Sequence, residues 1–184
     1  MMFFTGKGDD GRTGWLGKGR LPKYDARIEA LGTLDEATAA LGISRSLMEE
    51  LPEAALLLEA QRNLYSLMAE VATDPEKATK VQKILPETIQ TLEEHIQTLG
   101  AKLQMPQGFI LPGDSQPSAS LALSRAIVRR AERRVVELFD RGLVSNPLLG
   151  IYLNRLSSFC FALEIYVLQV GGRKHPTMAK GEDR

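Results

Sequence analysis

A glycine-rich segment near the N-terminus is the first part of the chain whose residues could do chemistry. It covers residues 5–23 and reads TGKGDDGRTGWLGKGRLPK. Gly6, Gly8 and Gly11 satisfy the dinucleotide-binding pattern G-x-G-x-x-G, and the same stretch nearly satisfies the phosphate-loop pattern, with Arg12 in place of the lysine. Both patterns need a preceding strand and a helix that follows at once, and the further glycines prevent that helix. We therefore predict neither of these nucleotide-binding folds.

The same segment could nevertheless bind an anion. Glycines allow successive backbone N–H groups to point into one concavity, which favours negatively charged ligands. Thr5 and Thr13 would add hydroxyl donors, and Lys7, Lys18 and Lys23 would add positive charge. Two interpretations are open at this point, a phosphate-binding loop and a flexible basic arm.

A row of arginines later in the chain, within RAIVRRAERRVVEL, is the second candidate site. At about 100° per residue, Arg125, Arg129 and Glu132 fall on one stripe of a helix, with Arg133 at its edge. Arginine in place of lysine favours the planar forks that bind phosphate, and an embedded glutamate could hold a cation or orient those forks. The alternative is a solvated charged face with weak ion pairs. The opposite, core-forming side carries Ile127, Val128, Ala131, Val135 and Leu138.

Three smaller features each have a structural and a functional interpretation. Asp35 would ordinarily be exposed on its helix, although the arginine row offers Arg125 as a partner. The apolar run FILPG at 109–113 lies within a loop and could close the end of a bundle or form the lip of a cleft. Asn154 and Arg155 interrupt an apolar helix, where a helix–helix hydrogen bond or a subunit contact would account for them.

Other chemistries find little support. The two histidines are His95 and His175, and neither belongs to the Glu-x-x-His pair of di-iron bundles. The single cysteine, Cys160, excludes an internal disulfide and suits a reducing cytoplasm. Its aromatic and aliphatic neighbours indicate a small buried hydrophobe.

Composition limits the partners. The chain has 184 residues, which fits one domain, and 23 basic residues balance 23 acidic ones. No global field would therefore attract nucleic acid or an anionic membrane. The first eight residues are too short and too polar for a signal peptide, and no apolar run approaches the roughly 20 residues that span a bilayer. We expect a cytoplasmic protein with neither a nucleic-acid nor a membrane partner.

Beyond residue 24, apolar residues recur at helical spacing in five segments. The first three expected helices are 26–49, 52–71 and 86–103. The fourth would be capped by Ser118 or Ser120 and stopped by Gly142, and the fifth would start at Pro147, capped by Ser145 or Asn146, and end before Gly171. No strand is expected. The prediction is an all-α, single-domain bundle over 1–184, made of a glycine-rich segment 1–24, a helical bundle 25–170 and a polar, disordered tail 171–184.

Taken in order, these segments resemble one family, the PduO-type ATP:cob(I)alamin adenosyltransferases. The resemblance spans roughly residues 3–170, and the string RRAERR is a specific part of it. The matching segments are Thr5–Thr13 followed by Lys23, Arg27–Glu36, Phe109–Gly113, Ser124–Val135 and Leu153–Ser158.

The resemblance implies a five-helix, ferritin-like up-and-down bundle that assembles as a homotrimer with ATP between subunits. The implied reaction transfers the 5′-deoxyadenosyl group of ATP to the cobalt of cob(I)alamin, with Mg²⁺ on the triphosphate. A cobalamin-dependent enzyme and a flavin reductant are candidate further partners. The implied ATP site comprises Thr5, Gly6, Lys7, Gly8, Thr13, Gly14, Lys23, Arg129, Arg130, Glu132, Arg133 and Asn154.

The resemblance also assigns a corrinoid site. Phe109 would stand under the corrin face, and Asp35 would pair with Arg125 of a neighbouring subunit beside it. With Arg129, these three residues would form the catalytic group. Glu132 is the candidate protein ligand for Mg²⁺.

The chain departs from the family pattern at several positions. Ser158 replaces an aspartate, Lys7 replaces a threonine, and Ala37-Thr38-Ala39 replaces Leu-Asn-Ser after the Asp-Glu pair. The residues lost around Asp35 and at Ser158 motivate a second hypothesis, a non-catalytic ATP- or corrinoid-binding relative that delivers or senses adenosylcobalamin.

Overall fold

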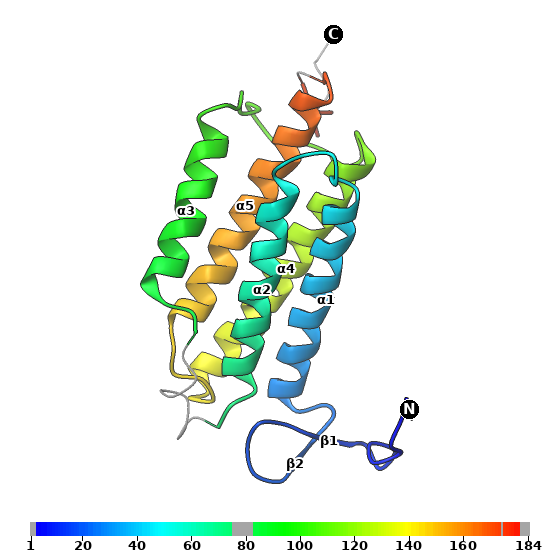
Figure 1. Ribbon diagram of the computed structural model, residues 1–184, viewed down its shortest axis with the longest axis vertical. Coiled ribbons are helices and arrows are strands. Elements are labelled where there is room, and N and C mark those ends of the chain that lie inside the picture. Colours follow the sequence, from blue (N-terminus) through cyan, green and yellow to red (C-terminus); the bar gives the residue numbers. More distant parts are fainter. Residues whose placement is uncertain (1–2, 75–82, 174, 181–184) are drawn as a thin grey trace.

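Five long helices form an up-and-down bundle, as Figure 1 shows. The computed structural model describes residues 3–74, 83–173 and 175–180. The predicted all-α class is confirmed, although the first and third helices end earlier than predicted. The helices are α1 (Ala26–Ser46), α2 (Ala54–Val71), α3 (Pro86–Gly100), α4 (Gln116–Asp140) and α5 (Leu148–Val170).

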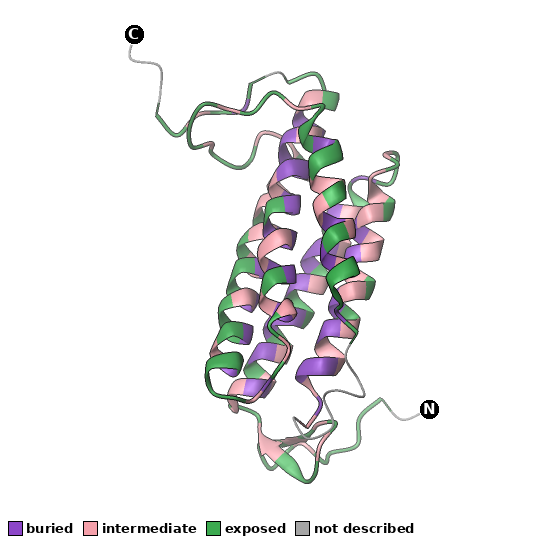
Figure 2. Ribbon diagram, turned by 90° about the vertical axis from the view of Figure 1, so that its left-hand side faces the viewer, coloured by how far each residue is buried: buried purple, intermediate pink, exposed green. Residues whose placement is uncertain are grey.

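The core lies between the facing sides of these helices, where Figure 2 shows the buried residues. α4 packs against α1 on one side and α5 on the other, while α2 packs against α1 and α3 against α5. On α4, Val128, Ala131 and Val135 are buried, whereas Arg129 and Arg133 are exposed. The predicted division of this helix into a core side and an arginine side is therefore confirmed.

The start of α4 differs from the prediction. Ser115, not Ser118 or Ser120, is its N-cap, and its hydroxyl accepts a hydrogen bond from the Ser118 backbone N–H. The helix includes Pro117 in its first turn, because proline lacks only an N–H that needs no partner there. Ser118 completes the capping box by accepting from the Ser115 backbone N–H. Gly142, with φ of +67°, stops the helix as predicted.

The start of α5 also needs a small correction. Pro147 occupies the N-cap position and provides no side-chain cap. Asn146 lies one residue further out, and its Oδ1 accepts from the Leu148 backbone N–H at 3.1 Å. Ser145 has no such role.

The N-terminal segment contains a short hairpin, so the expectation of no strand is wrong. β1 (Arg12–Gly14) and β2 (Arg20–Pro22) pair antiparallel, with Thr13 opposite Leu21. The hairpin lies beyond the end of the bundle where α1 begins (Figure 1). Periodicity could not reveal these three-residue strands, because they are too short to show alternation.

Part of the C-terminal tail is ordered, which corrects the prediction of a disordered tail for residues 175–180. Met178 pairs with Ile110, and the Leu111 backbone N–H donates to the Thr177 carbonyl at 2.8 Å. The Asp114 carboxylate accepts from the Thr177 hydroxyl and backbone N–H, each at 2.7 Å. The tail therefore holds the loop that carries the predicted apolar lip.

α5 is long and apolar enough to cross a membrane, with a mean hydropathy of 1.3, contrary to the expectation that no segment would be. However, 61% of the most apolar 18-residue stretch of this helix is buried inside the protein, so α5 is the core helix of this bundle. Cys160 lies on it, fully buried, as predicted. Burial raises the pKa of its thiol to about 12, so the thiol stays protonated.

Candidate active site

Three pockets lie in a row along α4 and α5. We call them the lower, middle and upper pockets, counted from the hairpin end, and their volumes are about 380, 380 and 600 Å³. Arg125 lines both the middle and the upper pocket, and Arg129 lines the middle one. Glu132 and Asn154 line the lower pocket. Arg125 and Arg129 of the predicted arginine row and Asn154 of the predicted α5 segment thus line pockets that follow one another along the same two helices. We call this row of pockets the groove.

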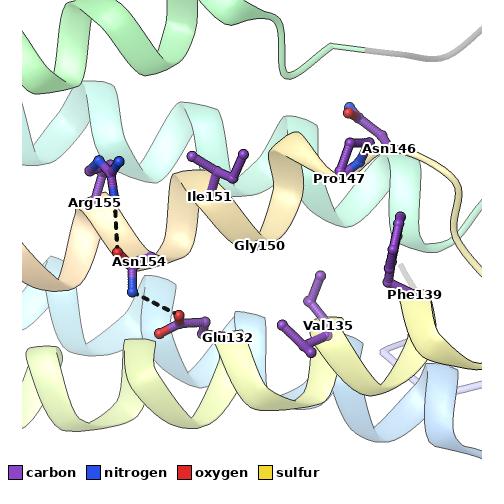
Figure 3. A pocket seen from close by; sticks show the side chains of 10 residues that line it. Glu132, Val135, Phe139, Asn146, Pro147, Gly150, Ile151, Asn154 and Arg155 are labelled. Atoms are coloured by element: carbon purple, nitrogen blue, oxygen red, sulfur yellow. Dashed lines mark hydrogen bonds between the residues drawn. The ribbon is translucent and has the colours of Figure 1, made fainter.

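A chain of hydrogen bonds organises the lower pocket, as Figure 3 shows. The Asn154 amide donates to Glu132 Oε1 at 3.0 Å, which joins α5 to α4. The Arg155 guanidinium donates to Asn154 Oδ1 at 3.0 Å and to Glu93 of α3 at 2.7 Å. Because Asn154 accepts and donates at once, its amide is fixed in one orientation. The pocket wall is otherwise mostly apolar.

The lower end of this pocket is held by a buried carboxylate. Glu70 accepts from the Asn146 amide at 2.9 Å and from the backbone N–H groups of Lys83 and Ile84 at 2.6 Å. Only 6% of Glu70 is exposed, so these three bonds offset the cost of its burial. Glu70 thereby fixes the turn that leads into α5.

The middle and upper pockets share one wall. The Arg125 guanidinium lies over the Phe161 ring, 5.5 Å from its centroid, which stabilises the cation by a cation–π contact. Phe109 lines the upper pocket from the loop before α4, and 88% of it is exposed. An apolar ring that exposed at a pocket mouth is suited to a large flat ligand or a partner surface.

The glycine-rich segment folds into consecutive turns. The Asp9 backbone N–H donates to the Gly6 carbonyl, and the Gly11 N–H donates to the Gly8 carbonyl, each at 3.2 Å. Lys23 lies against Gly8, where an added Cβ would stand 3.3 Å from the lysine Nζ. The predicted lysine and the predicted glycine loop are therefore adjacent, as an anion-binding cradle requires.

Arg20 and Arg27, to which the sequence analysis assigned no role, hold this segment in place. Arg20 acts within the segment. The Arg20 guanidinium pairs with the Asp10 carboxylate at 2.7 Å and donates to the Arg12 and Lys7 carbonyls, which fixes the turns. This pairing lowers the pKa of Asp10. These contacts of Arg20 join Lys7, Asp10 and Arg12 into one arrangement.

Arg27 attaches the hairpin to the bundle. It is 3% exposed, its guanidinium donates to the carbonyls of Val71, Thr73 and Leu143, and it stacks on Trp15 at 4.8 Å. Burial lowers its pKa. The only sequence signal for this role was its place in the Arg27–Glu36 segment.

Other predicted residues are not brought together within one protomer. Asp35 is exposed on α1 and forms no ion pair with Arg125 in the part of the chain that the structure describes. Arg130 pairs with Glu36 of α1, on the side away from the groove. The hairpin and the loop of Phe109 lie at opposite ends of the bundle (Figure 1). Within one protomer, the hairpin and the loop of Phe109 therefore do not line one site.

The described residues contain no group of three histidine, cysteine, aspartate or glutamate side chains that could hold a metal ion. Glu132 is the one carboxylate of the predicted ATP site in the groove, and one of its oxygens already accepts from Asn154. A magnesium ion there would depend on phosphate oxygens for most of its ligands.

The fold and the groove define a class, the helical-bundle proteins that carry a groove with arginines along two helices and a separate glycine-rich loop. A sequence model described as Cobalamin adenosyltransferase matches residues 3–167. This chain therefore belongs to the cobalamin adenosyltransferase family.

Individual relatives agree with this assignment. The chain is 37% identical over 164 residues to the corrinoid adenosyltransferase PduO of Salmonella typhimurium, which covers 89% of this chain and 48% of that protein. It is 36% identical over 166 residues to a corrinoid adenosyltransferase of Bacillus subtilis, covering 88% and 84%. The chain thus spans about half the length of the Salmonella PduO protein.

A solved structure has the same fold. A variant PduO-type ATP:corrinoid adenosyltransferase from Lactobacillus reuteri, complexed with cobalamin and ATP, superposes with a TM-score of 0.90 at 28% identity. The match covers 98% of this chain and 100% of that one. A second variant of that protein, complexed with ATP, gives a TM-score of 0.87, also at 28% identity.

Proposed function

We propose that this chain is an ATP:cob(I)alamin adenosyltransferase, which transfers the 5′-deoxyadenosyl group of ATP to the cobalt of a reduced corrinoid. The observation that carries the proposal is the groove along α4 and α5, in which Arg125, Arg129, Glu132 and Asn154 line adjoining pockets. It lies in a chain whose residues 3–167 match the family.

The reaction forms one bond and breaks one. The cobalt of cob(I)alamin attacks C5′ of ATP with its electron pair, and the C5′–O bond breaks so that its pair leaves with triphosphate. Because the nucleophile arrives with the substrate, the protein has to align the two substrates and stabilise the leaving group.

Positive charge and backbone donors would stabilise the triphosphate. The glycine loop supplies Thr5, Gly6, Lys7, Gly8, Thr13 and Gly14, with Lys23 held against it. The groove supplies Arg129. Arg133, which donates to the Arg129 carbonyl at 2.9 Å, and Arg130, which pairs with Glu36, would have to turn towards the triphosphate from outside the groove. Mg²⁺ would enter as the ATP complex, with Glu132 as its candidate protein ligand, and would neutralise part of the triphosphate charge.

The corrinoid would occupy the upper pocket. Phe109 would cover one face of the ring and keep water and a lower axial ligand away from cobalt. Arg125, placed over Phe161, would pair with Asp35 of a neighbouring subunit beside the ring.

The proposal includes assembly as a homotrimer with ATP between subunits. Its motivation is the separation of the hairpin from the loop of Phe109 within one protomer (Figure 1). We place the enzyme in the cytoplasm, where a flavin reductant could supply cob(I)alamin and a cobalamin-dependent enzyme could receive the product.

A second candidate is a relative that binds ATP or the corrinoid and delivers or senses adenosylcobalamin without forming it. The departure at Ser158 favours it, because an exposed hydroxyl that donates to the Asn154 carbonyl at 3.4 Å replaces a charge near the nucleotide.

A single-turnover assay separates the two candidates. The protein is mixed with ATP, Mg²⁺ and chemically reduced cob(I)alamin, and formation of the light-sensitive cobalt–carbon bond is followed by its absorption spectrum. Stoichiometric adenosylcobalamin and triphosphate support the enzyme. Nucleotide or corrinoid binding without that product leaves only the binding protein.

A further inference from the structure

The upper pocket contains a carboxyl group that the proposed chemistry does not use. Glu164 of α5 lines this pocket together with Phe109, Arg125 and Phe161. Only 4% of the residue is exposed. Within the described part of the chain, its carboxyl group has no hydrogen bond and no ion pair. The rest of the pocket wall is apolar apart from Arg125.

The surroundings of Glu164 do not neutralise it. From α4, Arg125 lies over Phe161 and lowers the pKa of Glu164, but makes no ion pair with it. From the preceding loop, Asp114 is occupied by Arg173 and Thr177 and adds negative charge. On α5, Cys160 is a protonated thiol. Burial outweighs these contributions and raises the pKa of Glu164 to about 7.

The Glu164 oxygens are not among the fully buried atoms without a partner, so they face the open space of the pocket. A carboxyl group that reaches a pocket from an otherwise buried residue, with no partner in the protein, points to a ligand that supplies its hydrogen bonds. A corrin ring carries primary amides on acetamide and propionamide arms around its rim. Such an amide has two N–H donors and one acceptor, and a carboxyl group can pair with it in either protonation state.

We propose that Glu164 binds a primary amide on the corrin rim and thereby selects amidated corrinoids over corrinoids with a carboxylate at that arm. The inference rests on the proposed function, because it takes the upper pocket as the corrinoid site. A carboxylate in place of the amide has no N–H to donate. It also brings a second negative charge into a largely apolar wall, where like charges repel strongly.

The experiment compares cobalamin with its monocarboxylates, in each of which one propionamide has been hydrolysed to propionate. Dissociation constants are measured with the full chain and ATP at pH 6 and pH 8, by titration of the visible spectrum of the cob(II) forms. We expect one monocarboxylate to bind the wild type at least about tenfold more weakly than cobalamin at pH 8. The ratio should be smaller at pH 6, where Glu164 holds its proton.

Two variants test the residue itself. Glu164→Gln keeps the size and the hydrogen-bonding capacity but removes the charge, so the ratio should fall towards one at both pH values while cobalamin still binds. Glu164→Ala should weaken cobalamin binding about tenfold or more, because the amide loses its partner. Glu94→Gln, an exposed glutamate on α3, is the matched control and should leave all ratios unchanged.

The outcomes distinguish this inference from the proposed function. Equal binding of all the corrinoids by the wild type, with adenosylation intact, overturns the role of Glu164 alone. A ratio that persists in Glu164→Gln does the same. Discrimination without formation of the cobalt–carbon bond supports Glu164 and overturns the proposed reaction. A wild type that binds no corrinoid overturns both.

Discussion

The lower and upper pockets of the groove differ in how their polar groups are satisfied. In the lower pocket, Glu132, Asn154 and Arg155 form a continuous chain of hydrogen bonds between α4 and α5. In the upper pocket, the carboxyl group of Glu164 faces the pocket without a partner in the described part of the protein, and the Phe109 ring is 88% exposed. The polar side chains of the lower pocket therefore have hydrogen-bond partners within the protein, whereas the carboxyl group of the upper pocket has none in the described residues.

This difference indicates which pocket has its donors and acceptors in place before a ligand binds. A satisfied network is rigid and holds its donors and acceptors before a ligand binds. An unpaired carboxyl group and an exposed aromatic ring reduce stability until a ligand or a partner covers them. On this view the lower pocket is preformed, whereas the upper pocket is completed by its occupant.

The largest effect is expected between the two ends, at Arg129. If the proposed function is right, Arg129→Ala should lower kcat/KM for adenosylation by about 100-fold or more, because a cation that the proposal places at the leaving triphosphate would be lost. Single-turnover and steady-state rates with ATP and cob(I)alamin measure it. Arg134→Ala is the matched control, since Arg134 is exposed and pairs with Glu137 at 3.2 Å. An equal loss of kcat/KM in Arg129→Ala and Arg134→Ala would contradict a specific role for Arg129.

The next effect concerns the exposed ring of the upper pocket. Phe109→Ala should lower kcat about ten- to 100-fold through loss of the apolar cover and of alignment, while the dissociation constant of ATP stays unchanged. Calorimetry with ATP and turnover with cob(I)alamin give the two quantities. Leu111→Ala, in the same loop and 49% exposed, should affect neither. Unchanged turnover in Phe109→Ala would exclude Phe109 from the mechanism.

The sequence predicted the bundle well because long helices repeat their apolar pattern many times. Val128 and Val135 on one side of α4, against Arg129 and Arg133 on the other, could be assigned from spacing alone. Gly142 marked the end of that helix, because a left-handed residue after the last turn favours glycine. The hairpin was missed, since three-residue strands carry no periodic signal.

The site was predictable only in part. The Glu132–Asn154 contact joins residues on different helices, and no local pattern reports which side chains meet across a bundle. The sequence could not single out Glu164, because glutamate is mostly exposed in proteins and its burial here is known only from the structure. The tail contacts the Phe109 loop through backbone pairing of Met178 with Ile110 and through the Asp114 carboxylate, which accepts from Thr177. Both contacts join residues more than 60 positions apart, so no local pattern reports them.

The unpaired carboxyl group should also affect stability. The ordinary pKa of a glutamate is 4.5, and that of Glu164 in the folded protein is about 7. The folded chain therefore binds more protons than the unfolded chain between these values, so the contribution of Glu164 to stability falls as pH rises from about 4.5 to 7. Glu164→Gln should then raise the free energy of unfolding by about 2 kcal/mol more at pH 8 than at pH 5. Urea denaturation of both proteins at the two pH values measures this difference, and a difference near zero would mean that the carboxyl group is solvated.

The smallest effect is expected in the lower pocket, where the substitutions remove a single hydrogen bond, between Glu132 and Asn154. A double-mutant cycle with Glu132→Gln and Asn154→Ala isolates the contact between them, whose length is 3.0 Å. We expect a coupling free energy of about 1 kcal/mol in the unfolding of the protein without ligand, because the bond exists before ATP binds.

The same cycle on ATP binding distinguishes a preformed pocket from one that the nucleotide assembles. If the bond is already present in the free protein, it contributes little further coupling to ATP binding. The fold change in the ATP dissociation constant of the double variant should then equal the product of the fold changes in the two single variants, within about twofold. If instead the coupling is absent from unfolding and appears in ATP binding, the lower pocket also depends on its ligand. The contrast with the upper pocket would then be wrong, because both ends of the groove would be completed by what they bind.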